Sequence, residues 1–327
     1  MIRYIGGRFF QAALIMFGVS VIVFFLVNLI PGNPYASMFS PDIPSEQVEA
    51  KLHEVGFYDP LPLKYIKWIG RLVRGDLGYS IFYRDKVSTI IFGRMLNTLL
   101  LTVSSLAISI LIGISAGIYT GRNRHGLADN TISVLTFILL SIPSFFFGML
   151  LIKIFGADLR LLPISGMITV TANYRGLDHV LDVIRHMIMP SFVLGLLYSA
   201  TMLRYTRSSA ISIINADFIR SARAHGLSER HILFKHLLKN ILIPIVTVLS
   251  LQIPDMLSGA LLIETVFVWP GVGRLSFEAV QHRDYPLIMG ILLLMALITL
   301  VANLIADITY ALIDQRITLG AENAETR

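Results

Sequence analysis

The sequence lacks the features that define several common functional classes. It contains no cysteine, which excludes disulfides and thiolate metal sites. No G-x-x-x-x-G-K-[ST] run occurs, so the chain has no phosphate-binding loop of that kind, and ATP-driven work would need a separate chain. His225, His231 and His236 show neither HExxH nor paired-His spacing, and no Ser/His/Asp set is recognisable. We therefore predict no enzyme activity, cofactor site or metal site in this chain.

Charged residues are also scarce. Of 327 residues only 15% are charged and 55% are hydrophobic. A soluble domain with this composition would have too few charged residues to cover its surface. The formal net charge of +6 would suggest a nucleic-acid partner in a soluble chain. Here it is better explained by basic loops that face anionic lipid headgroups. The composition predicts an integral protein of the lipid bilayer that binds no nucleic acid.

Apolar runs give the number of helices. Residues 9–30 are apolar for about 22 positions, enough to cross a bilayer core of roughly 30 Å, and too long for a signal peptide. Pro143 lies inside the third run, Pro254-Asp255 should interrupt the fifth, and residues 153–186 read as irregular. We predict an all-α polytopic membrane protein with six transmembrane helices, at residues 9–30, 95–121, 130–152, 187–203, 241–264 and 287–306.

Basic residues predict the orientation. Counted over all segments, Lys and Arg are tied at 13 on each side. Segments longer than about 60 residues are largely exempt from the positive-inside rule. Without the long insert at residues 31–94 the count is 13 against 5, which places both termini and residues 215–240 in the cytoplasm.

The most informative stretch is NADFIRSARAHGLSERHILFKHLLKNILIP, residues 215–244. Gly226 follows a helical run and permits a sharp turn at positive φ. Small residues on the preceding turn would let the backbone of a partner come close. The alternative is a plain basic loop that obeys the positive-inside rule and has no further role.

From ARAH onward, this stretch resembles the cytoplasmic coupling loop of binding-protein-dependent ABC importer permeases, in the dipeptide/oligopeptide/nickel branch. The family pattern is E-A-A-x-x-x-G followed by a hydrophobic-Pro pair. Arg220 and Ser221 replace its Glu and first Ala, Ala222 and Gly226 match it, and Ile243-Pro244 replaces Leu-Pro. The resemblance implies that an ATPase docks on Arg220, Ser221, Ala222, Arg223, Ala224, His225, Gly226 and Leu227.

Other segments resemble the same family in the same order, so that the match covers nearly the whole chain. These are PGNP (31–34), GDLGYS (75–80), LLPISGM (161–167), GALLIETVFVWPGVGRL (259–275), RDYP (283–286) and NLIADITYALIDQRI (303–317). Tyr65 and Trp68 share one helical face and are expected to pack at the membrane interface. Contact with a binding protein is the alternative for these two residues.

The resemblance implies a type I importer permease with an external insert between its first two helices. The expected divisions are an N-terminal helix (1–30), the extracytoplasmic insert (31–94), a core permease domain (95–317) and a cytoplasmic tail (318–327). The expected function is peptide import, with this chain forming half of the translocation pathway in a bacterial or archaeal cytoplasmic (inner) membrane. Partners would be a second homologous permease, two ATPase subunits that bind ATP and Mg, and an extracytoplasmic substrate-binding protein.

Two other transport functions remain open at this point. One is import of nickel or a metal chelate by the same branch, which the permease motifs do not separate from peptide import. The other is a secondary transporter or channel that works alone.

Four residues are candidates for the translocation pathway: Asp255, Pro254, Pro143 and Glu264. A charge within a span costs a few kcal/mol and is functional by default, which makes Asp255 the leading candidate. Interhelical hydrogen bonding is its alternative role. Pro143 could bend a helix along the pathway or only shape packing, and Glu264 could anchor the structure or form an external gate.

Overall fold

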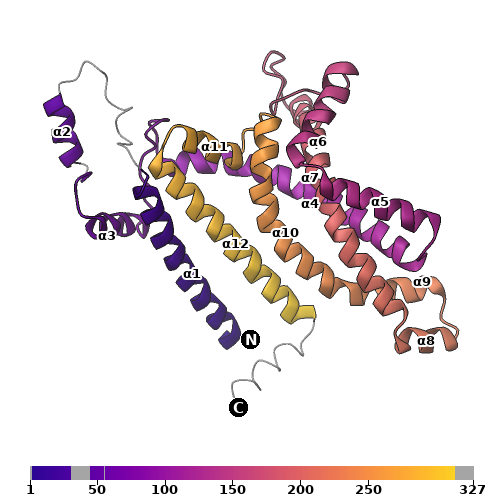
Figure 1. The fold of residues 1–327 in the computed structure, drawn as a ribbon. Helices are drawn as coiled ribbons and strands as arrows, with labels where there is room; N and C mark the ends of the chain where they lie inside the picture. The colour runs from indigo at the N-terminus through magenta and orange to yellow at the C-terminus, as the bar shows by residue number, and fades with distance from the viewer. Residues whose placement is uncertain (1, 31–44, 55, 314–327) are drawn as a thin grey trace. The chain divides into compact units, whose positions relative to one another are not determined.

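The structure is a computed structural model that describes residues 2–30, 45–54 and 56–313. Within these residues the chain is helical apart from its connections and one isolated antiparallel bridge between Tyr79 and Lys86. The chain, drawn as a ribbon in Figure 1, is divided into two compact units. Unit 1 combines residues 1–97 with 270–300, and unit 2 combines residues 98–269 with 301–327. The predicted tail 318–327 and the PGNP motif lie outside the described residues.

In the part of the chain that the structure describes, four helices are long and apolar enough to cross a membrane. They are α1 (Ile2–Asn28), α4 (Val87–Arg122), α7 (Leu177–Ile214) and α12 (Tyr285–Ile313). The remaining elements are α2 (Ser45–Glu54), α3 (Leu61–Leu72), α5 (Leu127–Ser141), α6 (Ser144–Leu151), η2 (Ile152–Asp158), α8 (Asp217–Ala224), α9 (Glu229–His231), η3 (Ile232–Leu237), α10 (Leu238–Val266) and α11 (Val272–Gln281).

If each of two bent pairs of helices is counted as one span, the described residues hold six candidate spans, in agreement with the six that the sequence predicts. The first pair turns by 103° between Ser141 and Ser144. Pro143 lies at this break, where its ring fixes φ at −59° in the residue that precedes α6. The second pair turns by 47° between Leu242 and Pro244.

Two of the expected irregularities are wrong. Pro254 does not interrupt the fifth span, since α10 continues through it and the bend lies before Pro244 instead. Residues 153–186 are irregular only from 159 to 176, because η2 precedes that stretch and α7 already begins at Leu177. Polar residues within the first turns of α7 hid this helix from a reading based on apolar runs.

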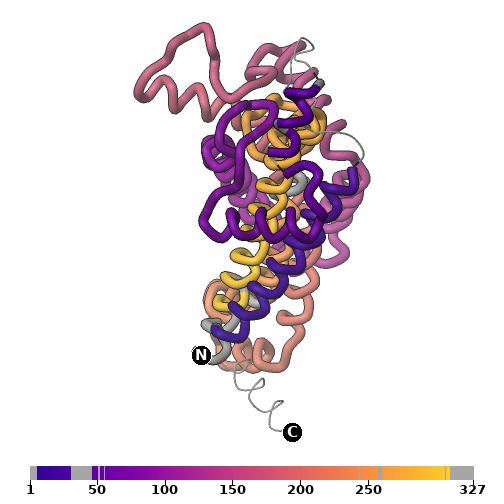
Figure 2. Tube along the Cα trace, turned by 90° about the vertical axis from the view of Figure 1, so that its left-hand side faces the viewer, coloured from indigo at the N-terminus to yellow at the C-terminus, as the bar shows by residue number. Residues whose placement is uncertain are grey.

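Unit 1 contains an aromatic cluster that joins α1, α3 and α12. The Phe24 ring lies 5.3 Å from the rings of both Tyr65 and Trp68, and the Ser20 and Tyr65 hydroxyls are 2.9 Å apart. Trp68 is only 8% exposed. The expectation that Trp68 itself contacts the membrane interface or a binding protein is therefore wrong, because this side chain is buried against α1, while Tyr65 is half-buried in the same cluster. Figures 1 and 2 show α1 and α12 running alongside each other, and their buried residues share this cluster.

Asp284 organises the start of α12 in unit 1. Its side chain is fully buried and accepts hydrogen bonds from the Ser80 hydroxyl, the Phe82 N–H and, at 3.2 Å, the Leu287 N–H. The last of these bonds is that of a helix N-cap, and Pro286 in the first turn suits the same helix start. The motif RDYP thus caps a helix and fastens the 80–83 segment to it.

A neighbouring contact holds the same segment. Tyr83 donates to the Glu278 carboxylate at 2.6 Å. Burial, followed by the bond to Glu278, raises the pKa of Tyr83 to about 12, so the hydroxyl remains a neutral donor at physiological pH.

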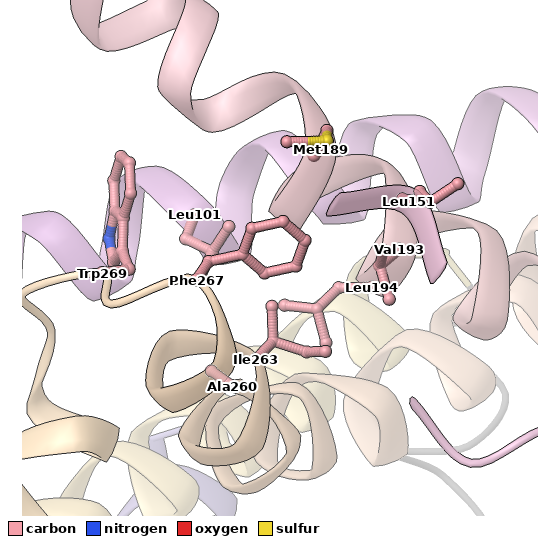
Figure 3. Packing of buried hydrophobic residues seen from close by; sticks show 9 residues of the cluster. All are labelled: Leu101, Leu151, Met189, Val193, Leu194, Ala260, Ile263, Phe267 and Trp269. Atoms are coloured by element: carbon pink, nitrogen blue, oxygen red, sulfur yellow. The ribbon is translucent and has the colours of Figure 1, made fainter. Parts of the chain in front are cut away.

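The main apolar cluster of unit 2 lies around the end of α10 and the residues that follow it, up to residue 269. Phe267 and the fully buried Trp269 pack with residues of α4, α6 and α7 (Figure 3). Trp269 donates its N–H to the Glu264 carbonyl at 2.8 Å, and Gly166 of the LLPISGM segment donates to the Phe267 carbonyl at 2.8 Å. Two of the segments that define the resemblance therefore pack against each other.

Glycines allow α4 and α7 to pack with their backbones in near contact. A Cβ added at Gly113, Gly117 or Gly121 would lie 2.6, 2.6 or 2.8 Å from side-chain atoms of Met202, Thr206 or Ala210. Gly195 of α7 makes the reciprocal contact with Ile108 of α4, where an added Cβ would meet atoms at 2.6 Å. Small residues at such positions are what lets two helices pack closely within a bilayer.

We expect Gly117→Leu to lower the free energy of unfolding by about 2 kcal/mol or more, because the new side chain would force α4 away from α7. Thermal unfolding of the purified chain in detergent measures the change. Gly93→Leu on the same helix is the matched control, since a Cβ there meets nothing within 4 Å. Equal unfolding temperatures for the two variants would contradict the α4–α7 contact.

Candidate functional site

The predicted coupling segment folds as a short helix held against the end of α7. After α7 ends at Ile214, α8 begins at Asp217, whose carboxylate in the first turn suits the positive end of the helix dipole. Ile219, Ala222 and Ile232 form a small buried cluster with Ile213 beside it. An isolated helix of this length would not be stable in water, so this cluster is what keeps α8 folded.

Gly226 ends α8 in a Schellman motif. Its φ is +75°, its N–H donates to the Arg223 carbonyl at 2.9 Å, and the Leu227 N–H donates to the Ala222 carbonyl at 3.2 Å. The sequence prediction of a sharp turn at positive φ is confirmed. A Cβ at Gly226 would meet nothing within 4 Å, so glycine is required here by conformation and not by crowding inside this chain.

The predicted docking residues divide into one that points inward and seven that are exposed. Ala222 is buried in the cluster with Ile219 and Ile232. Its small side chain therefore serves packing within this chain. The exposed residues are Arg220, Ser221, Arg223, Ala224, His225, Gly226 and Leu227. They form a surface that a partner could reach.

Glu229 connects this surface to the end of α4. Its carboxylate accepts from Arg223 Nε at 2.8 Å and lies 3.4 Å from a terminal guanidinium nitrogen of Arg122. All three side chains are partly exposed, so each pair contributes no more than about 1 kcal/mol. Their joint effect is to fix the position of α8 relative to α4. The sequence analysis missed Glu229, since the pairing with Arg122 spans more than a hundred residues.

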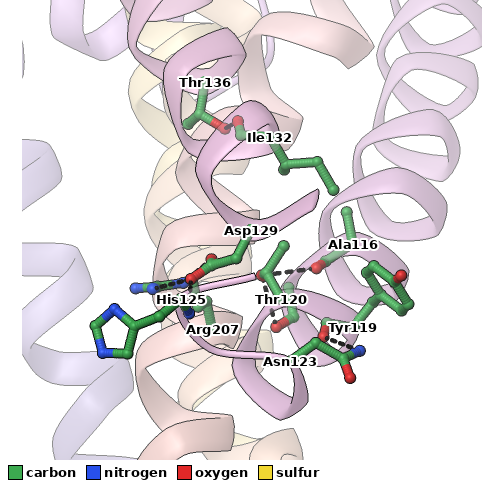
Figure 4. A network of polar contacts seen from close by, with 10 residues as sticks. Ala116, Tyr119, Thr120, Asn123, His125, Asp129, Ile132, Thr136 and Arg207 are labelled. Atoms are coloured by element: carbon green, nitrogen blue, oxygen red, sulfur yellow. Dashed lines mark hydrogen bonds and ion pairs between the residues drawn. The ribbon is translucent and has the colours of Figure 1, made fainter. Parts of the chain in front are cut away.

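A second ion pair lies at the same end of α4, α5 and α7. Arg207 of α7 binds both carboxylate oxygens of the buried Asp129 at 2.8 Å (Figure 4). Asp129 also accepts the N–H of His125, whose φ of +64° closes the turn between α4 and α5. This bidentate geometry is the strong form of an Arg–carboxylate pair. An acidic residue in the first turn of an apolar helix was the signal that could have indicated Asp129.

The predicted pathway residues occupy different environments. Asp255 is exposed on α10 and lies near enough to Tyr198 of α7 for the two to interact electrostatically, while Pro254 lies within the continuous helix. Pro143 lies at the 103° break. Glu264 is fully buried and accepts from the Thr98 hydroxyl at 2.7 Å, a geometry that favours the anchoring role over the gate.

Comparison with protein families gives two matches that together cover most of the chain. The family described as "Binding-protein-dependent transport system inner membrane component" matches residues 109–319. The corresponding N-terminal family matches residues 1–102. The first match contains the whole coupling segment, and the second contains α1, α3 and the start of α4.

Curated relatives match over almost their full lengths. The chain is 37% identical over 318 residues to the oligopeptide transport system permease protein AppB of Bacillus subtilis (strain 168), covering 97% of this chain and 99% of that protein. It is 35% identical over 317 residues to the glutathione transport system permease protein GsiC of Escherichia coli (strain K12), with the same coverage.

The fold is shared with a solved transporter. An inward-facing structure of the MetNI methionine ABC transporter matches with a TM-score of 0.55 at 16% identity. The match covers 69% of this chain and 96% of the transporter chain. At this identity the likeness shows the fold and nothing about the substrate.

We expect Glu229→Gln to loosen α8 without unfolding the chain. Loss of about 1 kcal/mol from the two arginine contacts would speed amide exchange about fivefold within residues 217–231. Hydrogen–deuterium exchange of the full chain in nanodiscs measures this. Asp158→Asn removes the carboxylate of another exposed ion pair, with Lys153, and is expected to leave residues 217–231 unchanged. Unchanged exchange in Glu229→Gln would show that Glu229 does not position α8.

Proposed function

Because the chain belongs to the family of binding-protein-dependent transport system inner membrane components, the permeases of ABC importers, we propose that it imports peptides and is moved through residues 215–240 by ATPase subunits on separate chains. The observation that supports the coupling role is the exposed turn formed by α8 and Gly226. This turn packs against Ile232, and Glu229 connects it to α4 through its contacts with Arg223 and Arg122. A rigid, exposed surface of this kind can receive a push and pass it on to long helices.

The route of transmission follows from the contacts within unit 2. Movement of α8 acts on α7 through the Ile219 cluster and on α4 through Glu229 and Arg122. Because α4 and α7 are in glycine contact and Arg207 is bound to Asp129, these helices would move together with α5. Rigid-body movement of packed helices, against a second homologous permease, provides alternating access.

The same family membership supports the remaining partners in this proposal. An extracytoplasmic substrate-binding protein delivers the substrate, two ATPase subunits bind ATP and Mg, and this chain forms half of the pathway. The excess of basic residues in the short loops supports cytoplasmic termini and a cytoplasmic coupling segment. The membrane is the cytoplasmic membrane of a bacterium or archaeon.

Peptide import is the substrate class that the relatives support. One relative is named for oligopeptides and another for glutathione, itself a small peptide, each at 35% identity or more over nearly the whole chain. Binding measurements on the cognate binding protein, with peptides and with nickel or its chelates, separate peptide import from the metal alternative.

We expect Gly226→Val to lower transport-coupled ATP hydrolysis at least tenfold in the assembled complex, because a β-branched residue is strained at a φ of +75°. Gly226→Asn is the matched control, since asparagine tolerates this conformation, and it should keep most of the activity. Proteoliposomes with all partner subunits give both peptide uptake and ATP hydrolysis. A Gly226→Val complex that assembles and transports normally would refute docking at this turn.

Asp255 provides a second test, directed at the pathway. Asp255 is exposed on α10, and in this proposal its carboxylate attracts the positively charged amino group of a peptide, so Asp255→Asn is expected to reduce peptide uptake about tenfold. Asp255→Glu keeps the charge and should restore most of the uptake. If the neutral variant transports peptides at the normal rate, Asp255 does not line the pathway.

A further inference from the structure

The helix α3 (Leu61–Leu72) has three distinct faces, only one of which is used inside the chain. One face carries Tyr65, Trp68, Ile69 and Leu72, which pack with α1 and α12. A second face is apolar and exposed. The third face is basic. The two faces left open have no assigned role in the function proposed above.

The packed face places α3 near one end of α1. Phe24 contacts both Tyr65 and Trp68, and Val27 belongs to the same cluster. Figure 1 shows α3 beside the end of α1 that is remote from residue 2. Counted from Arg8 at 1.5 Å per residue, Phe24 and Val27 lie about 24 and 28 Å along α1. In a bilayer whose hydrocarbon core is roughly 30 Å thick, this is the depth of the boundary between acyl chains and headgroups.

The exposed apolar face continues around α3 and its C-terminal turn. Leu63 is 42% exposed, Ile66 63% and Val73 82%. Leu26 of α1 is likewise 60% exposed in the same unit and at the same end of α1. A helix that exposes aliphatic side chains at this depth can insert them among acyl chains.

The basic residues recur at intervals of three, four and three residues and therefore share one side of α3. They are Lys64, Lys67 and Arg71 on the helix and Arg74 in the turn after it. Lys67 is bound to Asp59 at 2.6 Å, and Lys64 lies over the Phe57 ring. No carboxylate of the described residues lies within 4 Å of the exposed Arg71 and Arg74 guanidinium groups.

We propose that α3 is an interfacial anchor that inserts Leu63, Ile66 and Val73 into one leaflet and binds anionic phospholipid headgroups through Arg71 and Arg74. Three observations favour lipid over a protein partner: the depth on α1, the exposed aliphatic face, and cations directly beside that face. Long basic side chains at this depth extend their charges to the headgroups while their stems stay in the apolar region. In the orientation proposed above, this is the outer leaflet.

Spin labels test the position of the apolar face. The chain has no cysteine, so Ile66→Cys gives a single labelling site in the full chain. In nanodiscs the label should be accessible to oxygen and protected from a water-soluble nickel chelate, as should the reference Leu26→Cys on α1. Arg175→Cys, in an exposed loop of unit 2, supplies the aqueous reference. Chelate accessibility at Ile66→Cys equal to that at Arg175→Cys would overturn the proposal.

Affinity for anionic lipid tests the basic side. The double variant Arg71→Gln/Arg74→Gln should bind phosphatidylglycerol on the order of tenfold more weakly than the unmodified chain, measured by native mass spectrometry against phosphatidylcholine. Arg160→Gln/Arg175→Gln removes the same charge from another exposed segment and should leave the affinity unchanged. Equal losses in both double variants would show a general charge effect and refute a site on α3.

A protein partner is the outcome that would reassign this surface. If the purified binding protein protects the Ile66→Cys label in nanodiscs of pure phosphatidylcholine, and the label is accessible to the chelate before its addition, α3 docks a protein and the lipid proposal fails. None of these readouts depends on ATP hydrolysis or on the substrate, so they stand apart from the test of the transport function.

Discussion

Near contact between the backbones of α4 and α7 is the constraint on which unit 2 depends. Inside a bilayer, burial of apolar surface does not draw two helices together, because lipid tails are as apolar as the side chains. Association depends instead on close van der Waals packing, and Gly113, Gly117 and Gly121 permit it along three successive turns. The Asp129–Arg207 pair then fixes the same helices at their common end.

The position of the predicted coupling segment, residues 215–240, depends on that arrangement. Because α8 is too short to be stable alone, it takes its position from the Ile219 cluster and from Glu229, which connects it to the last residue of α4. Its exposed residues are therefore attached to helices that are joined to one another by the glycine contacts and the Asp129–Arg207 pair. In the function proposed above, this attachment lets the surface transmit a push that a flexible basic loop with the same sequence motif would dissipate.

In unit 1 a buried polar side chain joins segments that are far apart in the sequence. Asp284 is fully buried, and a buried carboxylate is costly unless its oxygens are bonded. Hydrogen bonds from Ser80, Phe82 and Leu287 satisfy it and hold a segment two hundred residues away in sequence. Within the described residues, Arg71 of α3 and Arg74 after it have no such carboxylate beside them, which agrees with the role at lipid headgroups proposed for them above.

The sequence by itself determined the features that depend on local periodicity and on single backbone positions. Apolar runs of about 20 residues predicted the helices, a glycine directly after a helical run predicted the positive φ at Gly226, and Pro143 predicted a bend. Family motifs predicted the transport class, which the full-length relatives support. The same local reading placed a break at Pro254 that α10 does not have, because neighbouring turns can carry a helix past one missing hydrogen bond.

Only the tertiary structure decided which side chains meet. Trp68 packs on Phe24, Glu229 joins Arg122 to Arg223, and Ala222 turns inward although its neighbours on α8 are exposed. Each of these contacts joins segments far apart in the chain or depends on the direction of a helix face. Periodicity predicts that a residue is buried, but packing in three dimensions decides which other residues bury it.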